Sequence, residues 1–223
     1  MTRLALPDLA FLSSVARGIV TDGLILHLDA GDPRSYPGSG TTWTDLSGSG
    51  NNGTLVNGVT YSSSNGGLFD FDGVNDYISI PINLTNTKYT IMGIARYKGT
   101  NNQRVISSNS QNWLMGWWDG KTDKYYAEGW VSSSTGGTAE TDWICYAATG
   151  DQPGDSWQLY RNGVSIVGPN AGGANGPNGI RLGGWETTEF SACQVSYVLA
   201  YNRVLTLQEV QQDFNALRGR FGL

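Results

Sequence analysis

The sequence has little charge and few of the side chains that enzymes use for nucleophilic catalysis. Lys and Arg number 14 and Asp and Glu number 19 in 223 residues, so 15% of the chain is charged, against about a quarter in typical domains. The one histidine, His27, lies in an alternating run that is typical of a strand. No Ser or Cys stands in a recognisable arrangement with it, so the pattern does not indicate a nucleophilic enzyme.

Clusters of basic residues and long apolar stretches are missing as well. The net charge is −5, and no cluster of Lys and Arg could neutralise a row of phosphates, which argues against nucleic-acid binding. No apolar stretch reaches the roughly 18 residues that a membrane-spanning helix needs. These absences favour a neutral, polar surface.

Cysteine is scarce. Cys145 and Cys193 are far apart, lack metal-ligand spacing and lie in apolar, strand-like runs. This favours two buried thiols, with a disulfide between adjacent strands as the alternative. Two cysteines in a chain of this length do not make a disulfide scaffold.

Glycine and aromatic residues are abundant, with 31 Gly, 8 Trp and 11 Tyr, a composition that favours β-structure with tight turns. Short runs of alternating apolar and polar residues follow one another without intervening helical patterns. They cover 23–30, 68–72, 77–80, 88–98, 112–118, 124–131, 142–149, 157–161, 164–167, 180–184 and 192–201. The sequence therefore predicts an all-β sandwich or barrel of about eleven or more antiparallel strands.

Three local signals are strong. Asn162-Gly163 is a preferred two-residue hairpin turn, and 112–118 and 124–131 indicate a second hairpin around 119–123. Near the C-terminus, Thr206 and Glu209 form a capping box, and the apolar spacing that follows predicts a helix ending at Gly219.

The first twenty residues read as an anchoring arm. Asp8 can cap a short helix over 9–17 that stops at Gly18. A cleaved signal peptide is the alternative, but Pro7 and Asp8 interrupt its apolar part. An apolar stripe would be exposed unless it is buried on a partner or on its own domain. The stripe comprises Leu4, Leu6, Leu9, Phe11 and Leu12.

The stretch 45–54, D-L-S-G-S-G-N-N-G-T, could be a linker or part of a folded unit. Strand patterns flank it on both sides, so we interpret it as part of one domain. Gly48, Gly50 and Gly53 are expected to supply backbone angles that other residues resist. The resulting division is an arm over 1–20 and one domain over 21–223.

Four stretches together resemble a known family. They are W-T-D-L-S-G-S-G-N-N-G-T-L (43–55), F-D-G-V-N-D-Y-I-S-I-P (71–81), L-Y-R-N-G-V (159–164) and Y-V-L-A-Y-N-R-V-L-T-L-Q-E-V (197–210). In this order they resemble LamG-like domains of the concanavalin A-like lectin/glucanase superfamily, over about 20–217. The resemblance implies a concanavalin A-like jelly-roll β-sandwich, a fold that carries many unrelated functions.

A narrower resemblance concerns residues 18–48, which are similar to the start of LamG-like proteins of tailed bacteriophages. It implies a non-enzymatic virion protein: a capsid decoration or cement protein, or a head-fibre subunit. Such a protein would be assembled in the host cytoplasm, displayed on the virion surface, bound to capsid or other virion proteins and self-associated, for example as a trimer. The alternative is a carbohydrate-binding adhesin, in a tail fibre or a secreted lectin-like protein, that recognises host-surface glycans.

The sequence offers two candidate binding sites. It offers no candidate catalytic residue, because the E-x-D-x-E carboxylates of the superfamily's glycosidases are absent. Aromatic residues on the 112–131 hairpin could stack on sugar rings, although alternate positions could equally be core. Since Trp117 and Trp118 are neighbours, one of them should face outward. The candidate glycan-binding residues are Trp117, Trp118, Asp119 and Tyr126.

The second candidate is a structural calcium site, which related jelly rolls often hold. Oxygen-bearing side chains gather around one turn, although Asn and Asp in a turn need no metal to explain them. They are Asp70, Asp72, Asn75 and Asp76.

Overall fold

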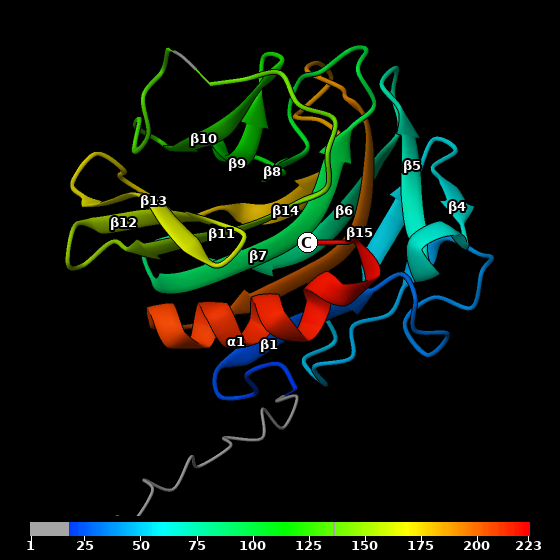
Figure 1. The fold of residues 1–223 in the computed structure, drawn as a ribbon, viewed down its shortest axis with the longest axis horizontal. Helices are drawn as coiled ribbons and strands as arrows, with labels where there is room; N and C mark the ends of the chain where they lie inside the picture. Colours follow the sequence, from blue (N-terminus) through cyan, green and yellow to red (C-terminus); the bar gives the residue numbers. More distant parts are fainter. Residues whose placement is uncertain (1–17, 136) are drawn as a thin grey trace, which may run out of the picture.

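The computed structural model describes residues 18–135 and 137–223. Two antiparallel sheets, which together contain fifteen strands, form a sandwich. One α-helix lies near the C-terminus of the described chain (Figure 1). This confirms the predicted all-β class. None of the described helices is long and apolar enough to cross a bilayer. The predicted helix over 9–17 and the arm residues Leu4, Leu6, Leu9, Phe11 and Leu12 lie outside the described residues.

The first sheet has eight strands, and its long strand β15 pairs with β7 along one edge and with β5 and then β1 along the other. In spatial order its strands are β13 (Val164–Asn170), β12 (Ser156–Arg161), β11 (Ile144–Asp151), β7 (Lys88–Tyr97), β15 (Ala192–Tyr201), β5 (Leu68–Asp72) and β4 (Thr60–Ser62), with β1 (Leu24–Asp29) beside β15.

The second sheet has seven strands. In spatial order they are β10 (Lys121–Ala127), β9 (Trp113–Trp118), β8 (Ile106–Ser108), β14 (Asn178–Leu182), β6 (Tyr77–Asn83), β3 (Gly53–Val56) and β2 (Thr42–Trp43). Both predicted hairpins are present, and Asn162 and Gly163 have the positive φ of their turn, 50° and 76°.

The main core lies between the sheets and is rich in aromatic rings. Its buried hydroxyls are paired across the sandwich. Trp113 Nε1 donates to Tyr89 Oη at 2.8 Å, Tyr89 and Tyr125 share a hydrogen bond of 2.9 Å, and Tyr125 Oη lies 3.0 Å from the Thr149 carbonyl oxygen. Burial without such partners would be costly, so these bonds fix how the two sheets face each other.

The outer face of the eight-stranded sheet, here called the covered face, is also apolar. Helix α1 (Leu207–Leu217) lies over it (Figure 1). The predicted capping box is confirmed, because Thr206 accepts from the Glu209 amide and Glu209 reaches back to the Thr206 amide. The helix ends two residues earlier than predicted, since Gly219 lies in a 3₁₀ turn over Arg218–Arg220. Buried on this face are Met92, Ile94, Cys145, Leu199, Tyr201, Val210, Phe214 and Leu217.

The two cysteines lie on opposite sides of that sheet. Cys193 belongs to the core between the sheets, and Cys145 belongs to the covered face. Both are buried free thiols, so the disulfide alternative is wrong.

Strand β1 departs from the predicted simple alternation. A register shift between Leu24 and Leu26 lets Leu24 pack on the covered face while Leu26 and Leu28 enter the core. His27 is an ordinary strand residue whose Nε2 lies 2.6 Å from the Tyr197 hydroxyl.

The stretch 45–54 is an integral loop. The Asp45 carboxylate accepts hydrogen bonds from the amides of His27, Ser47 and Asn51. Gly48 and Gly50 have φ of 87° and 78°, as expected. Gly53 does not have a positive φ; a Cβ there would lie 3.1 Å from Ile78 Cγ2, so this glycine serves close packing.

Candidate functional site

A group of aromatic side chains lies on the outer face of the seven-stranded sheet. Because strand side chains alternate, Trp113, Met115 and Trp117 of β9 enter the core, and Leu114 and Trp118 point the other way. The turn to β10 has positive φ at Asp119 and Gly120, 51° and 75°. On β10 the alternation continues with Tyr125 inward and Tyr126 outward. This outer side of the sheet, which includes Leu114, Trp118, Tyr126, Ser107 and Arg181, is called the open face below; Trp118 and Tyr126 are half-buried on it, and the other three are buried.

Three half-buried rings form a cluster there. Trp130, just beyond β10, forms a bridge with Tyr126. Its ring centroid lies 5.2 Å from that of Trp118 and 5.1 Å from that of Tyr126. These rings bound a shallow pocket of about 220 Å³ lined by Arg104, Asn112, Leu114, Trp118, Tyr126 and Trp130.

The polar side of the pocket is fixed in place. Arg104 is 5% exposed, forms an ion pair with Glu189 and donates from Nη1 to Asn112 Oδ1 at 2.9 Å. Its guanidinium also lies 4.2 Å from the centre of the Trp185 ring. Burial lowers the pKa of Arg104 from its usual value, but an arginine stays charged in proteins. The carboxylate of Glu189 therefore balances this charge.

Such an arrangement suits a sugar ring. Aromatic faces stack on the C–H face of a pyranose, and the accessible lining of this pocket is almost entirely apolar. The indole nitrogen of Trp117 is buried and has no hydrogen-bond partner within the described chain. Among the described residues, the indole nitrogens of Trp118 and Trp130 are not buried donors of this kind. The half-buried pair is thus adapted to an aqueous surface.

Two of the four predicted glycan-binding residues line the pocket, and the other two do not. Trp118 and Tyr126 line the pocket. Trp117 is fully buried, and its ring packs edge-on against Tyr146 with 4.7 Å between centroids, so its assignment to a glycan site is corrected to core. Asp119 is exposed in the hairpin turn and is not among the lining residues.

The described side chains predicted to bind calcium do not form a group of metal ligands. Asp70 pairs with Lys98 at 2.5 Å and accepts from Gln194. Asp72 accepts from the amide of Val74 and the Asp76 carboxylate accepts from the amide of Asp72. Among the described residues no group of three or more His, Cys, Asp or Glu side chains is placed to hold a metal.

Asn75 also serves the turn, since its backbone carbonyl accepts from the Asn57 side chain. Burial raises the pKa of Asp76 from its usual value, and the charges of Asp72 and Asp70 act in the same direction. Hydrogen bonds within the turn occupy Asp72 Oδ1 and Asp76 Oδ2, whereas Asp76 Oδ1 is buried without a hydrogen-bond partner in the part of the chain that the structure describes.

Sequence reasoning missed Arg104, which lies in a polar stretch without periodicity, and Asn112, which is the first residue of the predicted strand 112–118. Arg104 is placed by its contact with Glu189, which is distant in sequence, and Asn112 is placed by its contacts with Arg104 and Glu128. Trp130 belongs to the aromatic-rich hairpin 112–131 that the sequence indicated, but it was not among the four predicted glycan-binding residues.

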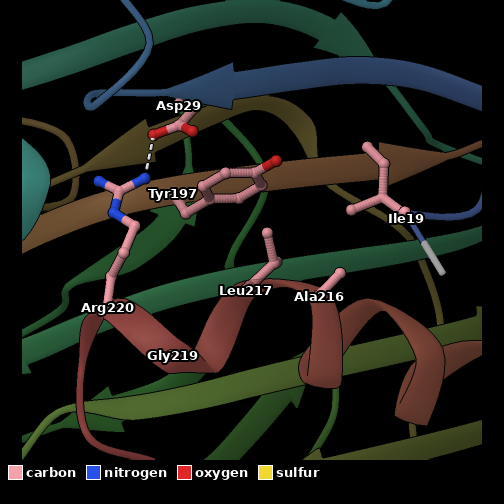
Figure 2. A pocket seen from close by; sticks show the side chains of 8 residues that line it. Ile19, Asp29, Tyr197, Ala216, Leu217, Gly219 and Arg220 are labelled. Carbon is pink, nitrogen blue, oxygen red and sulfur yellow. Dashed lines mark hydrogen bonds and ion pairs between the residues drawn. The ribbon is translucent and has the colours of Figure 1, made fainter. Parts of the chain in front are cut away.

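A second, larger cavity of about 420 Å³ lies between helix α1, β1 and β15 (Figure 2). Its polar side chains already have partners: Arg220 Nη1 lies 2.6 Å from Asp29 Oδ1, and the Tyr197 hydroxyl bonds to His27. Figure 2 shows the ion pair beside the Tyr197 ring. We interpret this region as the junction that holds the C-terminal turn against the sheet.

Comparison with known proteins finds likeness in fold alone. No family model matches the sequence, and no curated protein matches it. Among solved structures, the binding domain of Paraclostridial Mosquitocidal Protein 1 is 17% identical with a TM-score of 0.63, over 89% of this chain and 53% of that one.

Two other solved structures are similar. Trypanosoma rangeli sialidase has 14% identity and a TM-score of 0.62, over 89% of this chain and 33% of that one. The botulinum neurotoxin type G receptor binding domain has 16% identity and a TM-score of 0.57, over 86% and 51%. The chain thus spans about half of each toxin domain and a third of the sialidase. These likenesses show a β-sandwich shared with receptor-binding domains.

Proposed function

We propose that this protein is a non-enzymatic carbohydrate-binding module and that the open face carries its glycan site. The observation that carries the proposal is the pocket between Trp118, Tyr126 and Trp130, with Arg104 and Asn112 on its polar side. Rings that served only to close the core would lie between the sheets, as Trp117 does.

The solved structures support this proposal at a coarser level. Two of the similar structures are named as binding or receptor binding domains. The sialidase is an enzyme, but at 14% identity its likeness carries no catalytic inference. The module would bind by stacking of sugar rings on the aromatic side chains and by oriented hydrogen bonds.

A glycan array probed with the intact protein and with Trp118→Ala tests the proposal. We expect a discrete set of glycans to bind, and their signal to fall at least tenfold in the variant. Tyr61→Ala is the matched control, because Tyr61 is a partly buried aromatic residue on β4 of the other sheet. It should leave glycan binding unchanged.

Two results would contradict the proposal. One is an array with no bound glycan for the folded wild-type protein. The other is binding that Trp118→Ala leaves intact while its thermal unfolding is normal.

The proposal also includes where the module is located, and it is supported by the resemblance of residues 18–48 to phage proteins. We propose a virion-surface location, with attachment to capsid proteins through the apolar stripe of residues 1–20 and with self-association. Deleting residues 1–17 should then leave a folded sandwich that no longer attaches to capsids. Capsid attachment that survives this deletion would contradict the anchoring role.

A further inference from the structure

The three rings of the aromatic pocket meet at steep angles. The planes of Trp118 and Trp130 are inclined by 57°, and those of Tyr126 and Trp130 by 76°. A pyranose that stacks on one of these rings therefore meets the others with its rim. The cluster of Trp118, Tyr126 and Trp130 is thus a corner with aromatic walls rather than a continuous platform, and it is called the aromatic corner below.

The backbone holds Trp130 in this corner. After β10 the chain turns back, so that Trp130 forms a bridge with Tyr126. Two glycines pack closely behind it: a Cβ on Gly129 would lie 2.1 Å from the Gly172 carbonyl oxygen, and a Cβ on Gly172 would lie 2.7 Å from the Trp130 carbonyl oxygen. The corner is therefore formed before a ligand arrives, and binding does not have to order it.

The polar groups around the aromatic corner are already used within the protein. The Arg104 guanidinium pairs with Glu189, and Asn112 Oδ1 accepts from Arg104 at 2.9 Å. The Asn112 amide donates to Glu128 Oε1 at 2.9 Å, and the Asn112 carbonyl oxygen accepts from the Glu128 amide at 3.0 Å. A ligand group that enters the corner therefore meets mostly carbon atoms, in agreement with the almost entirely apolar accessible lining.

This lining decides which part of a sugar enters. A hydroxyl that leaves water for an apolar site without a new hydrogen bond loses free energy, whereas a methyl group gains free energy by leaving water. The pocket volume of about 220 Å³ is smaller than the roughly 300–1,000 Å³ of sites that enclose a whole small-molecule ligand. It suits one apolar substituent together with the edge of the ring that carries it.

The two indoles occupy different places in the corner. Trp130 contacts both other rings, so it forms the central wall. Trp118 ends β9 beside the exposed Asp119 of the hairpin turn, so a sugar that rests on Trp118 keeps its other hydroxyls in water. Such a sugar directs one substituent at Trp130.

We infer that the aromatic corner selects sugars that carry a methyl group, with the sugar ring stacked on Trp118 and the methyl group packed against Trp130. This inference rests on the proposed glycan-binding function and names the feature of the glycan that the site selects. Two kinds of sugar supply such a group: acetamido sugars, through the methyl of the N-acetyl group, and 6-deoxyhexoses, through C6.

A quaternary ammonium group is another ligand that aromatic walls commonly hold. No carboxylate is among the described residues that line the pocket, and one of the lining residues, Arg104, is itself a cation. The corner therefore matches a neutral methyl group better than a cationic one.

The test is an NMR titration of the whole protein labelled with ¹⁵N, with the indole signals of Trp118 and Trp130 as readouts. The probes are pairs of methyl glycosides that differ in one group. For the acetamido source, the pairs are the N-acetyl and N-formyl derivatives of glucosamine and of galactosamine, because the formyl group keeps the amide and lacks the methyl. For the 6-deoxy source, L-fucose is paired with L-galactose and L-rhamnose with L-mannose. N-methylacetamide and tetramethylammonium are the probes without a sugar.

We expect the methyl-bearing member of at least one pair to bind about tenfold more tightly than its partner, the ratio that one buried carbon gives in an apolar pocket. Trp130→Ala should abolish that ratio, because the central wall is gone while Trp118 remains. Trp130→Phe, which keeps a ring, should retain part of it. The pairs measured on the wild-type protein decide the inference even if Trp130→Ala does not fold.

Tyr61→Ala is the matched control. Tyr61 is also a half-buried ring that contacts two others, with its centroid 5.1 Å from that of Tyr36 and 6.0 Å from that of Phe69, but it lies on β4 of the other sheet. This variant should leave the ratio unchanged.

The failures are distinguishable. If both members of every pair shift the indole signals with equal affinity, or if folded Trp130→Ala keeps the ratio, this inference is overturned while the glycan pocket stands. If N-methylacetamide or tetramethylammonium binds as tightly as the sugars, the corner is a general apolar or cation site and the sugar assignment is overturned. A blank glycan array contradicts the proposed function itself, and this inference with it.

Discussion

The two outer faces of the sandwich differ in what lies on them. The covered face is apolar, and helix α1 buries it beneath Val210, Phe214 and Leu217 (Figure 1). The open face carries half-buried rings and a stacked arginine, and the α-helix of the described chain is on the opposite side. The same strand alternation builds both faces, so the difference comes from the residues at the outward positions.

The comparison separates residues that stabilise the fold from residues available to a ligand. On the covered face each large side chain meets another within the chain. On the open face Trp118 and Tyr126 line a pocket. Changes on the first face should therefore lower stability, and changes on the second should lower binding.

The largest expected effect concerns the adjacent tryptophans. Trp117→Ala removes a fully buried ring and should lower the free energy of unfolding by about 3–5 kcal/mol. Trp118→Ala removes a half-buried ring and should cost less than about 1.5 kcal/mol. Urea denaturation of both variants measures the difference, and equal losses would remove the distinction between core and open face.

Phe214→Ala tests the covered face. Phe214 is 9% exposed and packs in the cluster beneath α1. Its truncation should lower the free energy of unfolding by about 3 kcal/mol and leave glycan binding unchanged. Urea denaturation and the glycan array check both parts. A loss of glycan binding in the folded variant would place the site elsewhere.

Asp213 makes the covered face sensitive to pH. Its carboxylate accepts from the Val20 amide and the Tyr201 hydroxyl, both at 2.7 Å, and burial raises its pKa from 3.8 to about 6. Protonation therefore favours folding. The stabilising contribution is fully present below about pH 4 and is lost as the pH rises through 6, a change of about 3 kcal/mol.

Asp213→Asn should remove that pH dependence, because the amide remains neutral. Free energies of unfolding at pH 4.5 and 7 should fall more in the wild type than in the variant. Parallel pH profiles for the two proteins would show that Asp213 does not titrate in this window.

The smallest effect is at the start of α1. Thr206→Ala removes the side chain that accepts from the Glu209 amide and should cost about 1 kcal/mol. Thermal denaturation checks it. Thr206→Ser is the control, since it keeps the hydroxyl; equal losses in both variants would exclude the cap as the cause.

The sequence predicted the fold well where signals are local. Asn162-Gly163 and the Thr206–Glu209 box are short-range patterns, and both are present as expected. The bulge after Leu24 was not predictable, because it depends on pairing with β15, which lies far along the chain.

The candidate site was only half predictable. Alternation required one of Trp117 and Trp118 to face outward, but which one depends on how β9 sits against Tyr146 of the other sheet. Arg104 and Arg181 gave no pattern, since aromatic stacking on Trp185 and Tyr77 is set by tertiary contacts. The calcium site around Asp70 stays a prediction, and the pairing of Asp70 with Lys98 was not predictable because Lys98 is distant in sequence.

The central claim is that the open face binds a glycan. Its most direct test is chemical-shift mapping with the glycan that gives the strongest array signal. We expect the perturbed residues to cluster around Trp118, Tyr126 and Trp130 on the open face. Perturbations that cluster on α1 and the covered face, with the open face unchanged, would contradict the claim.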